Sequence, residues 1–110
     1  AVVGGRVIER HPDSDEPLLD VEIPDFQRAL EIAVRATTAT QLGYVGADVV
    51  VDAVHGALVL ELNARPGLQI QVANQRGLAP RLAALVDYPD AESMSLLDRI
   101  ALGRRIASAA

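Results

Sequence analysis

Two segments rich in Val and Leu, close together in the second half of the chain, restrict its fold more than any other feature. Residues 44–52 and 57–63 have the length and the residue types of β-strands. The four residues between them, Ala53-Val54-His55-Gly56, are a suitable length for a hairpin loop. The sequence therefore predicts an antiparallel hairpin.

The length of this loop decides which residues face each other. A two- or four-residue loop centred on Val54-His55 gives one register, whereas a three-residue loop with a bulge at Gly56 would shift the pairing by one. The pairs expected for the first register are Asp48–Glu61, Gly46–Asn63, Val50–Val59 and Asp52–Ala57.

Alternation along the two strands predicts one apolar face and one mixed face, because successive side chains point to opposite sides of a sheet. A one-residue slip would move Glu61 and Asn63 into the core, so burial favours this assignment. The expected apolar face holds Val45, Ala47, Val49, Val51, Leu58, Leu60 and Leu62. The expected mixed face holds Gly46, Asp48, Val50, Asp52, Val59, Glu61 and Asn63.

The mixed face carries the chemically informative residues. Like charges placed opposite each other destabilise a hairpin, so Asp48 facing Glu61 predicts a protonated carboxyl or a bound cation. With the amide oxygen of Asn63 they form an all-oxygen donor set suited to Mg²⁺ or Mn²⁺. Gly46, opposite Asn63, is expected to leave room for a bulky ligand. The alternative is that these polar residues only line a solvated sheet face.

Residues that follow the second strand extend this candidate site. Arg65 is placed to contact a phosphate or acylphosphate oxygen, and is the candidate catalytic residue. Gly67 is expected to supply a special backbone angle or a close approach to the cofactor. The alternatives are a surface Arg65 paired with a nearby acid and an ordinary turn at Gly67 after Pro66. Possible lining residues of an acceptor pocket are Gln69, Gln71 and Asn74.

The rest of the chain predicts an α+β fold, a small antiparallel sheet with helices packed on one face. Residues 1–10 suggest a strand or hairpin arm, and 11–17 a loop. The first expected helix begins near Asp25, which can cap it, and stops at Gly43. Two further helices are expected at 78–86 and at about 95–107. Ser95 and Asp98 have capping-box spacing at the start of the last one.

Composition excludes several kinds of chemistry. The 110-residue chain has no Cys and no Lys, so it lacks a thiolate nucleophile, a P-loop lysine and a Schiff-base lysine. A net charge of −5 argues against nucleic-acid and anionic-membrane partners. No apolar run approaches the ~20 residues of a membrane span. We expect a cytoplasmic protein.

The run Glu61-Leu62-Asn63-Ala64-Arg65-Pro66-Gly67, with Asp48 thirteen residues before Glu61, resembles the C-terminal motif of ATP-grasp enzymes. The closest likeness is to alpha-L-glutamate ligase-like proteins, related to sugar-transfer-associated ATP-grasp proteins, and it extends to about Val86. The segments GRVIERHPDS and IPDFQRALEIA resemble that group's sequence before the motif.

The resemblance implies two Mg²⁺ ions, with Asp48 binding one, Glu61 bridging both and Asn63 binding the second. It also implies ATP, a carboxylate substrate activated as an acylphosphate, and an amine acceptor, with release of ADP. Because the family's ATP-binding lysines precede this region, residues 1–110 are expected to form a single domain, the C-terminal part of an ATP-grasp fold without its N-terminal lobes. The parent would be a ligase and this piece alone inactive. The alternatives are a non-catalytic interaction module that retains the fold, or a simple divalent-cation-binding domain.

Overall fold

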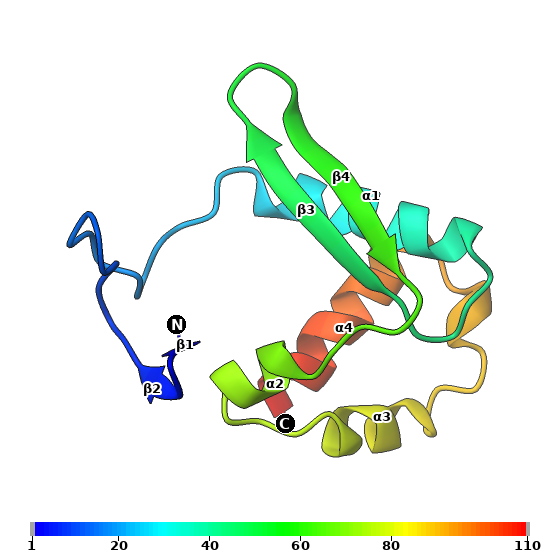
Figure 1. Cartoon of the computed structure of the whole chain (residues 1–110). Coiled ribbons are helices and arrows are strands. Elements are labelled where there is room, and N and C mark those ends of the chain that lie inside the picture. Colours follow the sequence, from blue (N-terminus) through cyan, green and yellow to red (C-terminus); the bar gives the residue numbers. More distant parts are fainter. Residues whose placement is uncertain (1, 110) are drawn as a thin grey trace.

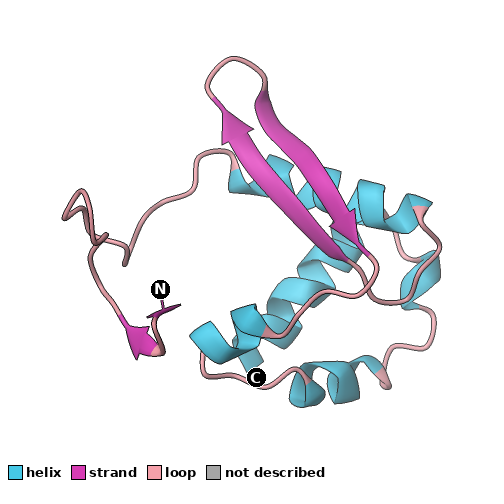
Figure 2. Ribbon diagram, in the orientation of Figure 1, coloured by secondary structure: helices cyan, strands magenta, loops and turns pink. Residues whose placement is uncertain are grey.

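The computed structural model describes residues 2–109, so Ala1, the first residue of the predicted arm, and Ala110 lie outside the described part. Two antiparallel strand pairs and several helices form an α+β arrangement, which confirms the predicted fold class (Figures 1 and 2). In chain order the elements are β1 (Val2–Val3), β2 (Arg6–Val7), α1 (Phe26–Ala39), β3 (Gly46–Asp52), β4 (Gly56–Asn63), α2 (Gln69–Ala73), α3 (Ala79–Leu85), the 3-10 helix η1 (Ala91–Ser93) and α4 (Leu96–Ala109).

The hairpin β3–β4 packs against α1, and α1 in turn packs against α4 (Figure 1). The most buried apolar side chains among residues 2–109 are Ala29 of α1 and Ile100 and Leu102 of α4. All three lie on α1 and α4, so side-chain burial is deepest on these two helices. Helix α1 therefore lies between the hairpin and α4 and packs against both.

The helix ends follow the predicted capping only in part. Asp25 occupies the N-cap position of α1, but its φ is 50° and its side chain makes no capping hydrogen bond, so that prediction is wrong. The helix ends at Ala39 with Thr40 as its C-cap residue, so the predicted stop at Gly43 is also wrong. For α4 the cap at Ser95 is confirmed, because Ser95 Oγ accepts a hydrogen bond from the Asp98 N–H at 3.2 Å. The Asp98 carboxylate accepts a hydrogen bond from Ser95 Oγ at 2.6 Å, in place of the backbone N–H that it would bind in a full capping box.

The segment before α1 forms an arm that projects from this body (Figure 1). Strands β1 and β2 pair through a turn in which Gly4 and Gly5 both have positive φ, as a tight hairpin turn requires. An exposed ion pair joins Arg10 to Asp15 at 2.9 Å. The radius of gyration is 15.5 Å, above the ~13 Å expected for a compact domain of this length. The excess reflects the projecting arm.

The tip of the β3–β4 hairpin has the three-residue loop that the sequence left open as an alternative. Asp52 pairs with Gly56, whose φ of 74° closes the loop. Near the tip, Val50 therefore faces Leu58, and the predicted Val50–Val59 and Asp52–Ala57 pairs are wrong. The physical reason is the left-handed conformation of Gly56, which favours three loop residues over two or four.

A β-bulge at Leu60 separates this tip register from the register at the other end of the hairpin. Val49 pairs with Val59 but Asp48 pairs with Glu61, so Leu60 is the additional residue. The bulge also changes the faces: Val59 is half-buried, sharing a face with Val49, whereas Leu58 is 40% exposed and Leu60 67% exposed. The predicted apolar face is therefore wrong for Leu58 and Leu60.

Candidate metal and phosphate site

The open end of the hairpin brings the predicted metal ligands together. Asp48 lies opposite Glu61, and Gly46 lies opposite Asn63, which confirms these two predicted pairs. The bulge at Leu60 makes this possible, because without it Glu61 would pair with Ala47 and share the face that α1 covers. Two carboxylates and one amide thus lie at adjacent positions of a two-stranded ladder.

Both carboxylates are exposed to solvent. Within residues 2–109, neither Asp48 nor Glu61 forms an ion pair or a side-chain hydrogen bond. Their mutual repulsion is therefore not balanced by a nearby Arg. In the same part of the chain no three His, Asp or Glu side chains converge as metal ligands, so Asn63 and groups from outside these residues would have to complete a cation's shell.

Asn63 is oriented by a turn directly after β4. Its Oδ1 accepts a hydrogen bond from the backbone N–H of Arg65 at 2.9 Å. An amide oxygen has two lone pairs, so this bond leaves one available to a further partner. The turn therefore fixes the direction of the Asn63 oxygen while retaining its capacity as a ligand.

Arg65 and Gly67, the other two predicted site residues, are exposed on the loop between β4 and α2. Within residues 2–109 no ion pair restrains the Arg65 guanidinium. Gly67 is not among the residues with positive φ, and a Cβ added there would meet nothing within 4 Å. The expectation of a special backbone angle at Gly67 is therefore wrong. Space for a close ligand is present.

The predicted room above Gly46 is filled by the chain itself. A Cβ built on Gly46 would lie 2.9 Å from Pro66 Cβ and 3.6 Å from Pro66 Cγ. The expectation that Gly46 accommodates a bulky ligand is therefore corrected, because the ring of Pro66 folds back over this position. Gly46 lacks a side chain where the loop approaches the strand.

The opposite end of the hairpin has its own polar contacts, which do not involve the candidate ligands. Asp52 Oδ1 accepts hydrogen bonds from the backbone N–H groups of His55 and Val54, at 2.8 and 2.9 Å, and lies 2.8 Å from His55 Nδ1. These contacts, the His55 backbone N–H first among them, lower the pKa of Asp52 from its usual 3.8. His55 therefore stabilises the loop.

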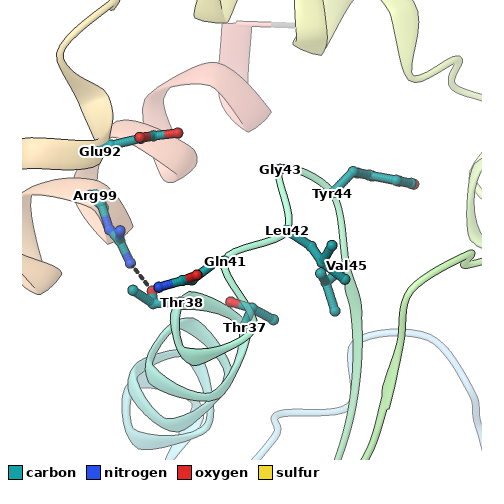
Figure 3. A pocket seen from close by; sticks show the side chains of 9 residues that line it. All are labelled: Thr37, Thr38, Gln41, Leu42, Gly43, Tyr44, Val45, Glu92 and Arg99. Carbon is teal, nitrogen blue, oxygen red and sulfur yellow. Dashed lines mark hydrogen bonds between the residues drawn. The ribbon is translucent and has the colours of Figure 1, made fainter.

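A polar hollow of about 730 Å³ lies beside the last turn of α1, and sequence reasoning missed it (Figure 3). There the guanidinium of Arg99 on α4 donates a hydrogen bond to Thr38 Oγ1. The last turn of α1 contains no basic residue, so Arg99 places positive charge near the carbonyl end of that helix. The other lining residues are Thr37, Gln41, Leu42, Gly43, Tyr44, Val45 and Glu92.

A smaller hollow of about 270 Å³ lies between α2 and α3. Gln71 lines it, as expected for an acceptor pocket, whereas Gln69 and Asn74 are not among its lining residues. Its walls are largely apolar, with Leu68, Val72 and Leu78 contributing.

The structure is an α+β lobe in which a helix packs behind the hairpin. At the open end of the hairpin two acids face each other, and the sequence Asn-x-x-Pro-Gly begins beside them. The side-chain oxygens of these residues gather at this end of the strands. The family model described as sugar-transfer associated ATP-grasp matches residues 1–87, and the chain belongs to this family. This confirms the resemblance to ATP-grasp proteins. The comparisons gave no match among curated proteins or solved structures. None of the helices within residues 2–109 is long and apolar enough to cross a membrane.

Proposed function

We propose that the chain is the metal- and phosphate-binding part of an ATP-dependent carboxylate–amine ligase. The observation that supports this most is the pairing of Asp48 with Glu61 next to Asn63, in a member of a family whose proteins generally use ATP and Mg²⁺. In this proposal Asp48 would hold one Mg²⁺, Asn63 would hold a second, and Glu61 would be shared between them.

The donor set fits Mg²⁺ because it consists of oxygen atoms alone and is incomplete. Mg²⁺ prefers six oxygen ligands and commonly takes several from substrate phosphates and water. Two carboxylates and one amide leave room for ATP phosphates in the shells of both ions. Bound Mg²⁺ neutralises charge on the phosphates.

The remaining residues act on the phosphate side of the site. Arg65, free of ion pairs within the described residues, donates to an oxygen of the transferred phosphoryl group or of the acylphosphate. The backbone at Gly67 approaches the nucleotide without steric hindrance. The γ-phosphoryl group passes to the substrate carboxylate, and an amine then attacks the acylphosphate and displaces phosphate.

We further propose that residues 1–110 form one domain, the C-terminal part of the ATP-grasp fold. In this proposal the ammonium groups that contact ATP come from outside these residues, because this sequence contains no Lys. The 110-residue chain alone is therefore expected to release no phosphate from ATP.

The decisive experiment measures Mn²⁺ binding by electron paramagnetic resonance in the longer protein that contains this chain, with and without a non-hydrolysable ATP analogue. Glu61→Gln preserves the shape and removes one charge, and we expect nucleotide-dependent Mn²⁺ affinity to fall at least about tenfold. Asp52→Asn, on the same hairpin but at its tip, is the matched control and should bind as the wild type does.

The outcomes separate the alternative functions. Equal Mn²⁺ affinity with and without nucleotide would favour a simple divalent-cation-binding domain. Nucleotide-dependent binding without turnover on any carboxylate would favour a non-catalytic module. Wild-type affinity in Glu61→Gln would contradict the metal assignment.

A further inference from the structure

The contact between Gly46 and Pro66 connects the first residue of β3 to the loop after β4. Pro66 is the only half-buried residue between positions 61 and 70, where its neighbours are all exposed. A Cβ on Gly46 would meet its ring carbons at 2.9 and 3.6 Å. Ordinary contacts between carbon atoms are about 3.5–4.0 Å. The loop is thus seated against a position where a side chain does not fit.

The seated residue is rigid and stands in a short loop. Proline fixes its own φ, so Pro66 cannot move its ring away without moving the backbone on either side. That backbone includes Arg65, whose N–H bonds Asn63 Oδ1 at 2.9 Å. Asn63 itself pairs with Gly46 across the ladder. The end of the hairpin is therefore held by a ring of contacts, in which each residue touches or pairs with the next: Gly46, Pro66, Arg65 and Asn63.

We propose that Gly46 is a positioning residue, which acts through Pro66 to hold the turn that aims the Asn63 oxygen and places Arg65. This inference rests on the proposed function, since it assigns a purpose to the orientation of two residues of that site. The absence of a side chain lets Pro66 approach the strand. The resulting loop position brings the Arg65 N–H to one lone pair of Asn63 Oδ1 and leaves the other for the cation.

The test is Gly46→Ala, with Gly43→Ala as the matched control. Gly43 lies three residues earlier, has no positive φ, and a Cβ there meets nothing within 4 Å. In metal-free protein, Gly46→Ala should shift the amide resonances of Arg65 and the side-chain resonances of Asn63 and speed hydrogen exchange at the Arg65 N–H. The control should leave all three unchanged.

A second substitution distinguishes positioning from general destabilisation. Pro66→Gly removes the ring that a Gly46→Ala methyl group would meet, so Gly46→Ala should have little further effect on the Arg65 amide in that background. Loss of stability without a specific clash would instead add to the effect of Pro66→Gly. Additive effects, or unchanged Arg65 and Asn63 signals in Gly46→Ala, would overturn the proposal.

Measuring Mn²⁺ binding then tests whether the position of this turn affects the metal site. Gly46→Ala should weaken nucleotide-dependent Mn²⁺ binding about tenfold, the size usual for groups that orient a metal ligand, while Gly43→Ala binds normally. Unchanged affinity in Gly46→Ala, with normal binding by the wild type, would overturn the positioning role. If the wild type binds no Mn²⁺ with nucleotide, the proposed function fails, and so does the role of Gly46 at a metal site. The resonances and hydrogen exchange of the metal-free protein still show whether Gly46 holds the turn.

Discussion

The opposed carboxylates of Asp48 and Glu61 should repel each other measurably in the metal-free protein. Directly opposed side chains have Cβ atoms about 5 Å apart. Two unit charges at about 5 Å in water interact by about 0.8 kcal/mol. Because both groups are exposed, the aqueous value is the appropriate one. Salt at about 0.15 M, with a Debye length of about 8 Å, reduces it to roughly half.

The perturbation is Asp48→Asn, which removes one charge and retains the shape. We expect it to stabilise the metal-free protein by about 0.7 kcal/mol at about 10 mM salt and by about 0.4 kcal/mol at about 0.15 M. The sign follows from the charged pair being unfavourable only in the folded hairpin.

The assay is urea denaturation of the wild type, Asp48→Asn, Glu61→Gln and the double variant, combined as a double-mutant cycle. The cycle isolates the interaction between the two groups from the effect of each substitution alone. Mg²⁺ at millimolar concentration, with nucleotide present, should stabilise the wild type and have little effect on the variants. A coupling energy that is zero or attractive at low salt would refute the reasoning that the two carboxylates share one site.

Two further predictions concern the support of the site. Leu102→Ala, at a position 3% exposed on α4, should cost about 2–3 kcal/mol in urea denaturation, at the lower end of the usual range because the small core can relax. Leu97→Ala on the same helix, at a position 60% exposed, should cost less than about 0.5 kcal/mol. Equal losses would contradict the assignment of Leu102 to the core. Asp52→Asn should destabilise the protein near neutral pH, because a lowered folded-state pKa means the ionised form stabilises the fold. This difference should disappear as pH falls below the usual 3.8 and through the lowered value, and a difference that persists in acid would exclude the ionised carboxylate as its cause.

Sequence reasoning located the open end of the hairpin correctly because burial restricts it. Glu61 and Asn63 cannot face a helix without losing their hydration, so they share the exposed face with Asp48 and Gly46, as the Asp48–Glu61 and Gly46–Asn63 pairs do. At the tip, no residue of β4 would lose hydration by facing the helix. Val50 opposite Val59 and Val50 opposite Leu58 are equally apolar, so the pattern could not distinguish two or four loop residues from three.

Contacts between distant segments could not be predicted. The Arg99–Thr38 bond joins residues 61 positions apart, and nothing in either local sequence specifies the partner. The missing basic residue in the last turn of α1 was the available signal, but it indicates only that some cation would be favourable there. The Gly46–Pro66 contact was likewise hidden, because a glycine opposite Asn63 indicates close approach without identifying what approaches.

The bulge at Leu60 makes the two ends of the hairpin independent for protein engineering. A four-residue tip loop that includes Gly56 would pair Asp52 with Ala57 and give the tip the same register as the open end, so the extra residue at Leu60 would no longer be needed. The pairing of Asp48 with Glu61 is compatible with either arrangement. The tip is therefore a suitable place to insert an affinity tag without moving the Asp48–Glu61 pair, and hairpins with different tip lengths can keep the same pair of opposed carboxylates.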